Sequence, residues 1–232
     1  MTTPSRPVDS FTVDHLTVDA ARPLALAGFW AALLGWRQEG PVVRPPDTDG
    51  CEFALAFVSE TAAKTHKNRL HLDLSSRTLD HQREVVAHAR MLGARLLDVG
   101  QGDVPWVVLA DPEGNEFCVL EPRPEYADTG TLAALVVDSP DPARLAAFWS
   151  ALIGWPVTST HAEITGLRSP SARGPAIEFL LSTDPQRGRN RLRPALRTPA
   201  PNEPADATDP EGNEYSLTPQ VWRKDQKQRG LV

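Results

Sequence analysis

Two histidines have the surroundings that binding or proton-transfer chemistry requires. His15 and His71 each lie in a short segment in which polar and apolar residues alternate, a pattern typical of strands with one buried face. On the polar side His15 is joined by Thr17, and His71 by Asp73. An imidazole titrates near neutral pH, so either side chain could contact a ligand or act as a general base. The simpler alternative is that both rings are satisfied by polar neighbours such as Asp73.

Composition excludes several classes of partner. The chain has 232 residues, a net charge of −6 and no long basic run, which argues against nucleic acid or an acidic membrane surface as a partner. Two cysteines, Cys51 and Cys118, are too few for a disulfide scaffold and suit a reducing compartment. Residues 1–10 show no signal-peptide pattern, and no apolar run approaches the ~20 residues that span a bilayer. We therefore expect a soluble cytoplasmic protein.

Three phrases occur twice, in the same order. The first copies are Phe29–Trp36, Asn68–Leu70 and Asp111–Glu116, and the second copies are Phe148–Trp155, Asn190–Leu192 and Asp209–Glu214. The last phrase, Asp-Pro-Glu-Gly-Asn-Glu, returns unchanged, and its Pro and Gly are typical of a hairpin turn. Because the order is kept, the chain is an internal duplication.

The duplication predicts the order of domains and elements. We expect a complete first domain and a truncated second one, because the second copy is shorter by about one helix and one strand and carries a proline-rich stretch instead. Apolar stripes predict helices beginning at Pro23, near Leu79 and at Pro142. The predicted divisions are an N-terminal tail (1–10), the complete domain (11–122), a linker (123–130), the truncated domain (131–219) and a polar C-terminal tail (220–232).

The repeated helix end and the repeated hairpin resemble the vicinal-oxygen-chelate superfamily, the glyoxalase, bleomycin-resistance and extradiol-dioxygenase group, and within it the glyoxalase-like domain branch. The resemblance implies an α+β fold in which tandem βαβββ modules curl into an incomplete barrel around a ligand. It implies no single activity, because the superfamily contains isomerases, dioxygenases, transferases and proteins that only sequester drugs. Function must therefore be argued from the site.

The resemblance also implies which residues face the cavity. Metal-using relatives take one histidine from the first strand of each module and a glutamate from a last strand, and His15 and His71 stand at the histidine positions. The carboxylate position is Cys118, which departs from the pattern; Glu116, on the same face, is a weak substitute. The expected ligand-binding residues are His15, Thr17, His71, Asp73, Trp106 and Cys118, and no residue is assigned a catalytic role.

The second copy keeps none of these ligands. Alignment of the repeats places Ala134 at the position of His15, Arg193 at that of His71 and Ser216 at that of Cys118. Arg193 is interpreted either as a surface arginine or as a group that holds an acidic ligand. We expect the second domain to pack, dimerise or cover the first.

The preferred interpretation is a protein that binds a small organic molecule in the cavity of residues 11–122 without a tightly bound metal. The alternative is a metal-dependent lyase, isomerase or dioxygenase in which His15 and His71 hold iron, manganese, nickel or zinc, and vicinal substrate oxygens chelate the ion. A third possibility is that side chains fill the cavity and the protein is only an interaction module. Whether the protein is an enzyme and whether it forms a homodimer stay open.

Overall fold

The structure is a computed structural model that describes residues 11–198 and 205–218. The tails predicted over residues 1–10 and 220–232 lie outside the described residues, as does residue 219. The helices are α1 (Pro23–Leu34), α2 (Leu79–Met91), the short 3-10 helix η1 (Pro124–Tyr126) and α3 (Pro142–Ile153). In the described part of the chain, no helix is long and apolar enough to cross a bilayer.

The strands fall into four groups along the chain, which we call modules 1 to 4. Module 1 contains β1 (Thr12–Ala20), β2 (Arg37–Glu39), β3 (Val42–Arg44) and β4 (Ala54–Ser59). Module 2 contains β5 (Leu70–Leu74), β6 (Arg95–Leu96), β7 (Val107–Ala110) and β8 (Glu116–Val119). Module 3 contains β9 (Leu132–Ser139), β10 (Val157–Thr160), β11 (Ile164–Leu167) and β12 (Ala176–Leu181). Module 4 contains β13 (Leu192–Arg197), β14 (Ala205–Thr208) and β15 (Glu214–Thr218), with no helix among its described residues.

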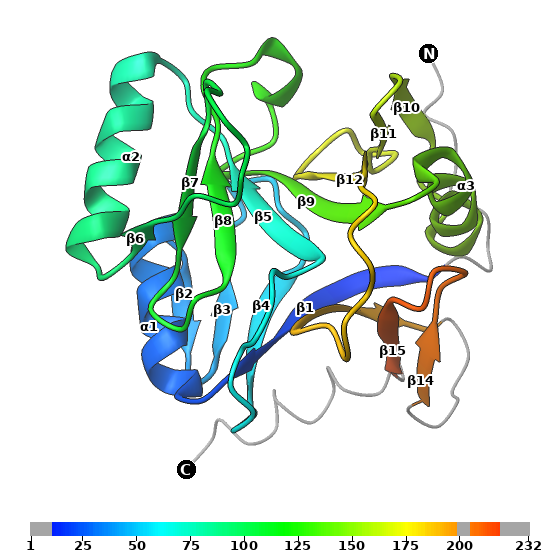
Figure 1. Cartoon of the computed structure of the whole chain (residues 1–232), viewed down its shortest axis with the longest axis horizontal. Coiled ribbons are helices and arrows are strands. Elements are labelled where there is room, and N and C mark those ends of the chain that lie inside the picture. Colours follow the sequence, from blue (N-terminus) through cyan, green and yellow to red (C-terminus); the bar gives the residue numbers. More distant parts are fainter. Residues whose placement is uncertain (1–10, 199–204, 219–232) are drawn as a thin grey trace.

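The modules pair crosswise into two sheets. The first sheet has the order β14-β15-β13-β1-β4-β3-β2 and joins modules 1 and 4. The second has the order β10-β11-β12-β9-β5-β8-β7-β6 and joins modules 2 and 3 (Figure 1). The junctions are antiparallel, β1 with β13 and β5 with β9. The α+β fold with two open sheets agrees with the sequence prediction. The expectation that residues 11–122 close around one cavity does not hold, because their two halves belong to different sheets.

One hydrophobic core lies behind both sheets. Leu16 of β1 and Leu72 of β5 belong to the same buried cluster, together with α1. Trp30 of α1 packs edge-on against Phe117 of β8, with ring centroids 5.2 Å apart. Because side chains alternate along a strand, the polar residues of β1 and of β5 lie on the faces that point away from this core.

The repeated phrases contact one another, which explains why they recur together. The Trp30 indole N–H donates to Asp111 Oδ2 over 3.2 Å, and the Trp149 indole N–H donates to Asp209 Oδ2 over the same distance. In both copies the aspartate also accepts from the asparagine four residues later. Each hairpin therefore clamps the tryptophan of its own repeat, because a buried indole N–H needs an acceptor.

Candidate ligand-binding site

The two predicted histidines lie in different sheets. His15, on β1, belongs to the first sheet, where its Nδ1 lies 3.0 Å from Asp14 Oδ2. Burial and the positive charge of Arg44 lower the pKa of His15, so this ring is neutral at physiological pH. His71 lies on β5 of the second sheet. The prediction that His15 and Thr17 share a cavity with His71 and Asp73 is therefore wrong, because β1 pairs with β13 rather than with a strand of module 2.

A buried ion pair occupies the outer face of the first sheet. Arg193, at the repeat position of His71, donates from Nη1 and Nη2 to the carboxylate of Asp19 over 2.8 and 2.7 Å. The two side chains are only 8% and 5% exposed. Arg193 is therefore not a surface arginine, and its charge is already paired within the protein. A bidentate arginine–carboxylate pair of this kind links strands rather than capturing a ligand.

The second sheet brings three predicted residues together. Donor atoms of His71, Asp73 and Cys118 lie within 4.8 Å of one another. Strand register explains this cluster, because Asp73 of β5 is directly opposite Cys118 of the parallel strand β8. Nε2 of His71 lies 3.3 Å from Asp73 Oδ1. Within the described residues, no other set of three His, Cys, Asp or Glu side chains converges in this way.

Two residues that the sequence analysis missed complete the cluster. Tyr126 donates its hydroxyl proton to Oε1 of Glu178 over 2.7 Å, and both side chains are buried. Glu178, on β12, lies opposite Val136 of β9, which in turn lies opposite His71. Tyr126 comes from the predicted linker, through η1. We call His71, Asp73, Cys118, Tyr126 and Glu178 the His71 cluster.

A signal for Glu178 is present in the sequence. It is the single charged residue inside the apolar strand Ala176–Leu181, where a solvated carboxylate is out of place. The sequence around Tyr126 shows no comparable pattern. Tyr126 lies in η1, outside any strand, so its contact with Glu178 cannot be read from strand alternation.

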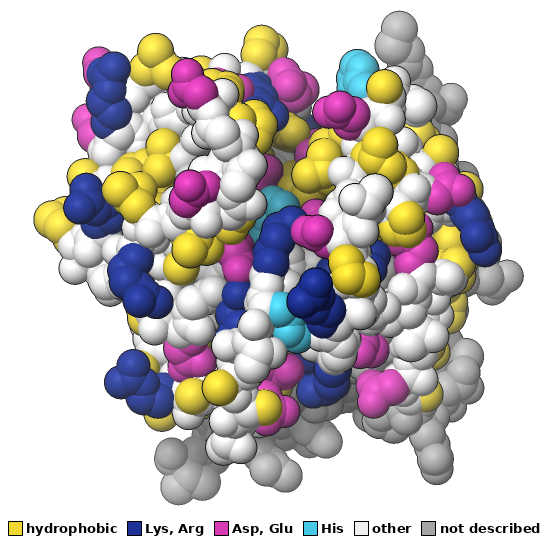
Figure 2. Space-filling view, viewed as in Figure 1, with side chains coloured by type: hydrophobic (Ala, Val, Ile, Leu, Met, Phe, Trp, Pro, Cys, Tyr) yellow, Lys and Arg dark blue, Asp and Glu magenta, His cyan; other side chains and the backbone are white. Residues whose placement is uncertain are grey.

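Apolar and aromatic side chains surround the cluster. Cys118 and Tyr126 belong to a small hydrophobic group that includes the predicted residue Trp106. The Arg123 guanidinium stacks over the rings of Trp106 and Tyr126, 5.6 and 6.0 Å from their centroids. The surface is hollowed between the part that carries β7 and β8 and the part that carries β10 to β12, above β5 and β9 (Figure 2). Such an arrangement, with apolar walls and few polar groups, is typical of small-molecule sites.

Charges within the cluster shift its titrations. Burial lowers the pKa of His71, but contact with Asp73 and the charges of Asp73 and Asp138 outweigh that effect and raise it overall. Burial and the Asp73 carboxylate raise the pKa of the Cys118 thiol, which stays protonated. Asp73 Oδ1 is buried and makes no hydrogen bond of good geometry in the described structure. The cluster therefore offers a buried acceptor beside an imidazole that favours the charged form.

Glu116, the weak substitute ligand, is not part of the cluster. Its Oε1 accepts from Lys64 Nζ over 2.5 Å and its Oε2 accepts from the Asn68 backbone N–H over 3.2 Å. Its role is to hold the segment before β5 in place.

Comparison with known proteins assigns the family. The model of the glyoxalase-like domain matches residues 15–120 and 134–208. Glyoxalase I from Zea mays is a similar solved structure, with 12% identity, a TM-score of 0.60, and coverage of 90% of this chain and 92% of that one. A putative dioxygenase from Bacillus subtilis has 11% identity, a TM-score of 0.60, and coverage of 92% and 86%. At these identities the likeness shows the fold alone.

A curated sequence match adds no functional information. The carbamoyl phosphate synthase large chain of Neisseria gonorrhoeae is 23% identical over 152 residues, which are 65% of this chain and 14% of that protein. This chain thus matches only a small part of the length of that relative. The family model, by contrast, covers most of the chain and agrees with the strand order of the two sheets. The chain belongs to the glyoxalase-like domain family of the vicinal-oxygen-chelate superfamily.

Proposed function

We propose that the protein binds a small organic molecule over the His71 cluster, on the outer face of the second sheet. The observation that carries this proposal is the convergence of His71, Asp73 and Cys118 within 4.8 Å at the edge of a small apolar group. Apolar walls remove a ligand from water, and a few buried polar groups fix its orientation. The site differs from the predicted one in that His15 and Thr17 take no part and modules 2 and 3 both contribute.

The cluster supplies complementary polar contacts. The charged form of His71 donates a hydrogen bond to an anionic or carbonyl oxygen, and Asp73 Oδ1 accepts from a hydroxyl or amine. Trp106 offers an aromatic surface for an apolar part of the ligand, held in place by Arg123. A molecule with an aromatic or aliphatic body and an oxygen-bearing head group meets both requirements.

A ligand screen with a matched pair of variants tests the proposal. Small aromatic acids, phenols and α-keto acids are screened by thermal shift, and hits are titrated by calorimetry against His71→Ala and His15→Ala. We expect His71→Ala to weaken binding about tenfold or more, as the loss of a buried charged hydrogen bond does. His15→Ala should bind as the wild type does. Equal losses in both variants, or no hit at all, would overturn the proposal.

A metal-dependent activity is the second candidate, and a specific observation favours it. Imidazole, carboxylate and thiolate are ligands that zinc, iron and nickel accept, and the buried acceptor Asp73 Oδ1 is directed at this group. His71, Asp73 and Cys118 would hold such an ion, and Cys118 would lose its proton on binding. A divalent ion would supply Lewis-acid polarisation of substrate oxygens. His15 and His71 cannot share the ion, since they lie in different sheets.

Metal titration separates this candidate from simple ligand binding. Chelator-treated protein is titrated with Zn²⁺, Ni²⁺, Fe²⁺ or Mn²⁺, and bound metal and released protons are both measured. If the cluster is a metal site, wild type and His15→Ala take up about one ion with proton release, whereas His71→Ala and Cys118→Ser do not. Equal uptake by wild type and His71→Ala would show that the ion binds elsewhere.

A further inference from the structure

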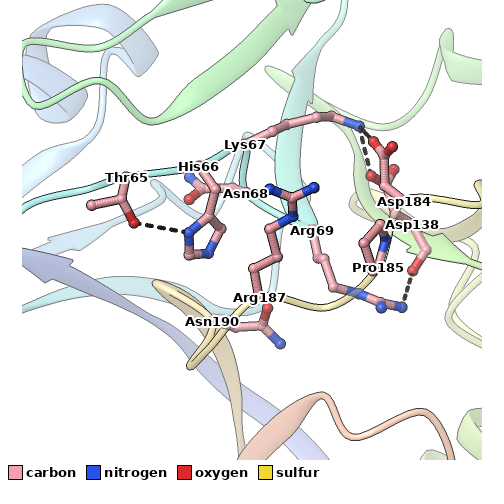
Figure 3. Close-up of a pocket in the computed structure, with 10 residues that line it drawn as sticks. All are labelled: Thr65, His66, Lys67, Asn68, Arg69, Asp138, Asp184, Pro185, Arg187 and Asn190. Atoms are coloured by element: carbon pink, nitrogen blue, oxygen red, sulfur yellow. Dashed lines mark hydrogen bonds and ion pairs between the residues drawn. The ribbon is translucent and has the colours of Figure 1, made fainter.

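A separate polar cavity lies between the segments that lead into β5 and β13. Its volume is about 290 Å³, and it is lined by residues 65–69, by Asp138 near the end of β9, and by Asp184, Pro185, Arg187 and Asn190. The side chains of interest are Lys67, Arg69, Asp138, Asp184, Arg187 and His66 (Figure 3). None of them belongs to the His71 cluster, so the cavity calls for an explanation beyond the proposed function.

One end of the cavity carries negative charge that is only partly neutralised. Asp138 is 2% exposed, and its Oδ2 accepts from Lys67 Nζ over 2.6 Å. Its Oδ1 is buried and has no hydrogen-bond partner among the described residues. Asp184 lies near the same ammonium, 3.9 Å from Lys67 Nζ, with its side chain 67% exposed. Two carboxylates thus share one lysine, and one buried oxygen is left to accept a hydrogen bond.

The other part of the cavity carries positive charge with no carboxylate partner. Arg187 is exposed and makes no hydrogen bond or ion pair with any described residue. In the close-up its guanidinium lies between the His66 ring and the group formed by Lys67, Asp138 and Asp184 (Figure 3). The Nδ1 atom of His66 is 3.1 Å from Thr65 Oγ1, so the other ring nitrogen is left for a ligand. Arg69, whose Nη2 is paired with Glu211 over 3.3 Å, keeps a buried Nε–H that has no acceptor among the described residues.

This distribution of charge disfavours ligands that carry only positive or only negative charge. A phosphate or simple carboxylate would meet Asp138 and Asp184, and a simple amine would meet Arg187 and Arg69. A molecule with both an ammonium and a carboxylate satisfies both ends. Each buried group left unpaired costs free energy, so a ligand that supplies both a donor and an acceptor gains most.

We infer that this cavity binds a small zwitterion of the α-amino acid class. The ammonium group pairs with the exposed Asp184, next to the buried Asp138 carboxylate, and the carboxylate accepts from Arg187 and His66. The volume is near the lower end of ordinary small-molecule sites, which suits a free amino acid rather than a peptide or nucleotide.

The test is calorimetric titration of the full chain with standard L-amino acids, one at a time, after a thermal-shift screen. For the amino acid that binds best, the matching decarboxylated amine and the N-acetyl derivative are titrated as well. We expect the zwitterion to bind at least about tenfold more tightly than either derivative, because each lacks one of the two charged contacts.

Exposed residues give variants that keep the fold intact. Arg187→Gln and Asp184→Asn should each weaken binding by about tenfold, since each removes a charged hydrogen bond. Arg83→Gln, on the exposed face of α2, is the matched control and should bind as the wild type does. The inference is overturned if no amino acid binds, if the amine or N-acetyl derivative binds as tightly as the zwitterion, or if Arg187→Gln binds unchanged.

Discussion

At the level of single residues, the two sheets show how duplicated positions acquire different roles. Arg193 and His71 occupy matching repeat positions, but Arg193 forms a bidentate pair with Asp19, whereas His71 makes only a longer contact, of 3.3 Å, with Asp73 Oδ1. Burying a charged pair costs desolvation free energy, which is offset only if the two groups interact with good geometry. The outer face of the first sheet therefore carries an internal ion pair, whereas the outer face of the second carries the polar groups that we propose contact a ligand.

The hydrogen bond between Tyr126 and Glu178 gives a pH-dependent prediction. Burial raises the pKa of Glu178, although the bond from Tyr126 opposes that shift. The native state then keeps the proton to higher pH than the unfolded state, whose pKa is near 4.5. Stability associated with Glu178 is therefore lost as pH rises from about 4.5 through the folded-state pKa.

Glu178→Gln removes this titration and keeps an acceptor for the Tyr126 hydroxyl. We expect the variant to gain stability relative to the wild type as pH rises from about 4.5 to 7, as measured by urea denaturation at several pH values. A difference between the two proteins that stays constant over this range would contradict the assignment.

At the level of elements, the segment between η1 and β9 is fixed by contact with Asp49. Oδ2 of Asp49 accepts from the Thr131 backbone N–H over 3.1 Å and from the Thr131 hydroxyl over 2.8 Å. It also accepts from the Trp36 indole N–H over 3.2 Å. Gly130 has φ +84°, and a Cβ at this position would overlap the Asp49 carbonyl oxygen. The predicted linker is thus a docked segment that positions Tyr126.

A pair of glycine substitutions tests this docking. Gly100 has a similar φ, +83°, but a Cβ there would meet nothing within 4 Å. Gly100→Ala should cost about 1–2 kcal/mol of unfolding free energy, from the positive φ alone. Gly130→Ala should cost clearly more and weaken ligand binding at the His71 cluster. Equal stability of the two variants in urea denaturation would show that the contact with Asp49 is not tight.

The ion pair between β1 and β13 gives a second prediction at this level. Asp19→Asn leaves the buried Arg193 charge without its carboxylate, and Arg193→Met leaves Asp19 only the longer contact with the exposed Arg189, so we expect each to destabilise the protein by about 3–5 kcal/mol. The double variant Asp19→Leu/Arg193→Met should recover most of that loss. The check is a double-mutant cycle in denaturant, and additive losses would mean that the two side chains do not act as a pair.

The sequence predicts the elements well and the site only in part. Helices at Pro23–Leu34 and Pro142–Ile153 follow from apolar periodicity and local caps, and the structure confirms them. The common face of His71 and Asp73 also follows, since strand alternation is local, whereas Cys118 on β8 is placed beside them by the family resemblance. The separation of His15 from His71 does not, because it depends on which modules share a sheet. The pairing of modules is determined by contacts between residues distant in sequence, such as those of β1 with β13. Periodicity within a segment does not predict such contacts.

At the level of the whole molecule, crosswise pairing makes the two copies of the duplication depend on each other. One edge of β1 pairs with β13, and one edge of β5 pairs with β9, and both partners belong to the second copy. Unpaired strand edges tend to associate with other chains. The truncated copy is therefore required for both sheets, and it contributes Glu178 to the His71 cluster. The homodimer considered from the sequence stays a prediction.

Truncation tests this dependence. A chain that ends at residue 122 should lose cooperative unfolding and should self-associate, because the edges of β1 and β5 are exposed. Light scattering after size exclusion and thermal unfolding by circular dichroism give the two readouts. A monomeric fragment that unfolds cooperatively would show that residues 11–122 form an independent domain.

At the same scale, we propose that the protein binds its ligand over His71 and not beside His15. It is tested most directly by long-range ¹H–¹⁵N NMR of the histidine rings while the best compound from the aromatic-acid, phenol and keto-acid screen is added. We expect the His71 ring signals to shift saturably with the compound, while the His15 signals stay in place. Saturable shifts of His15 with His71 unmoved would contradict it.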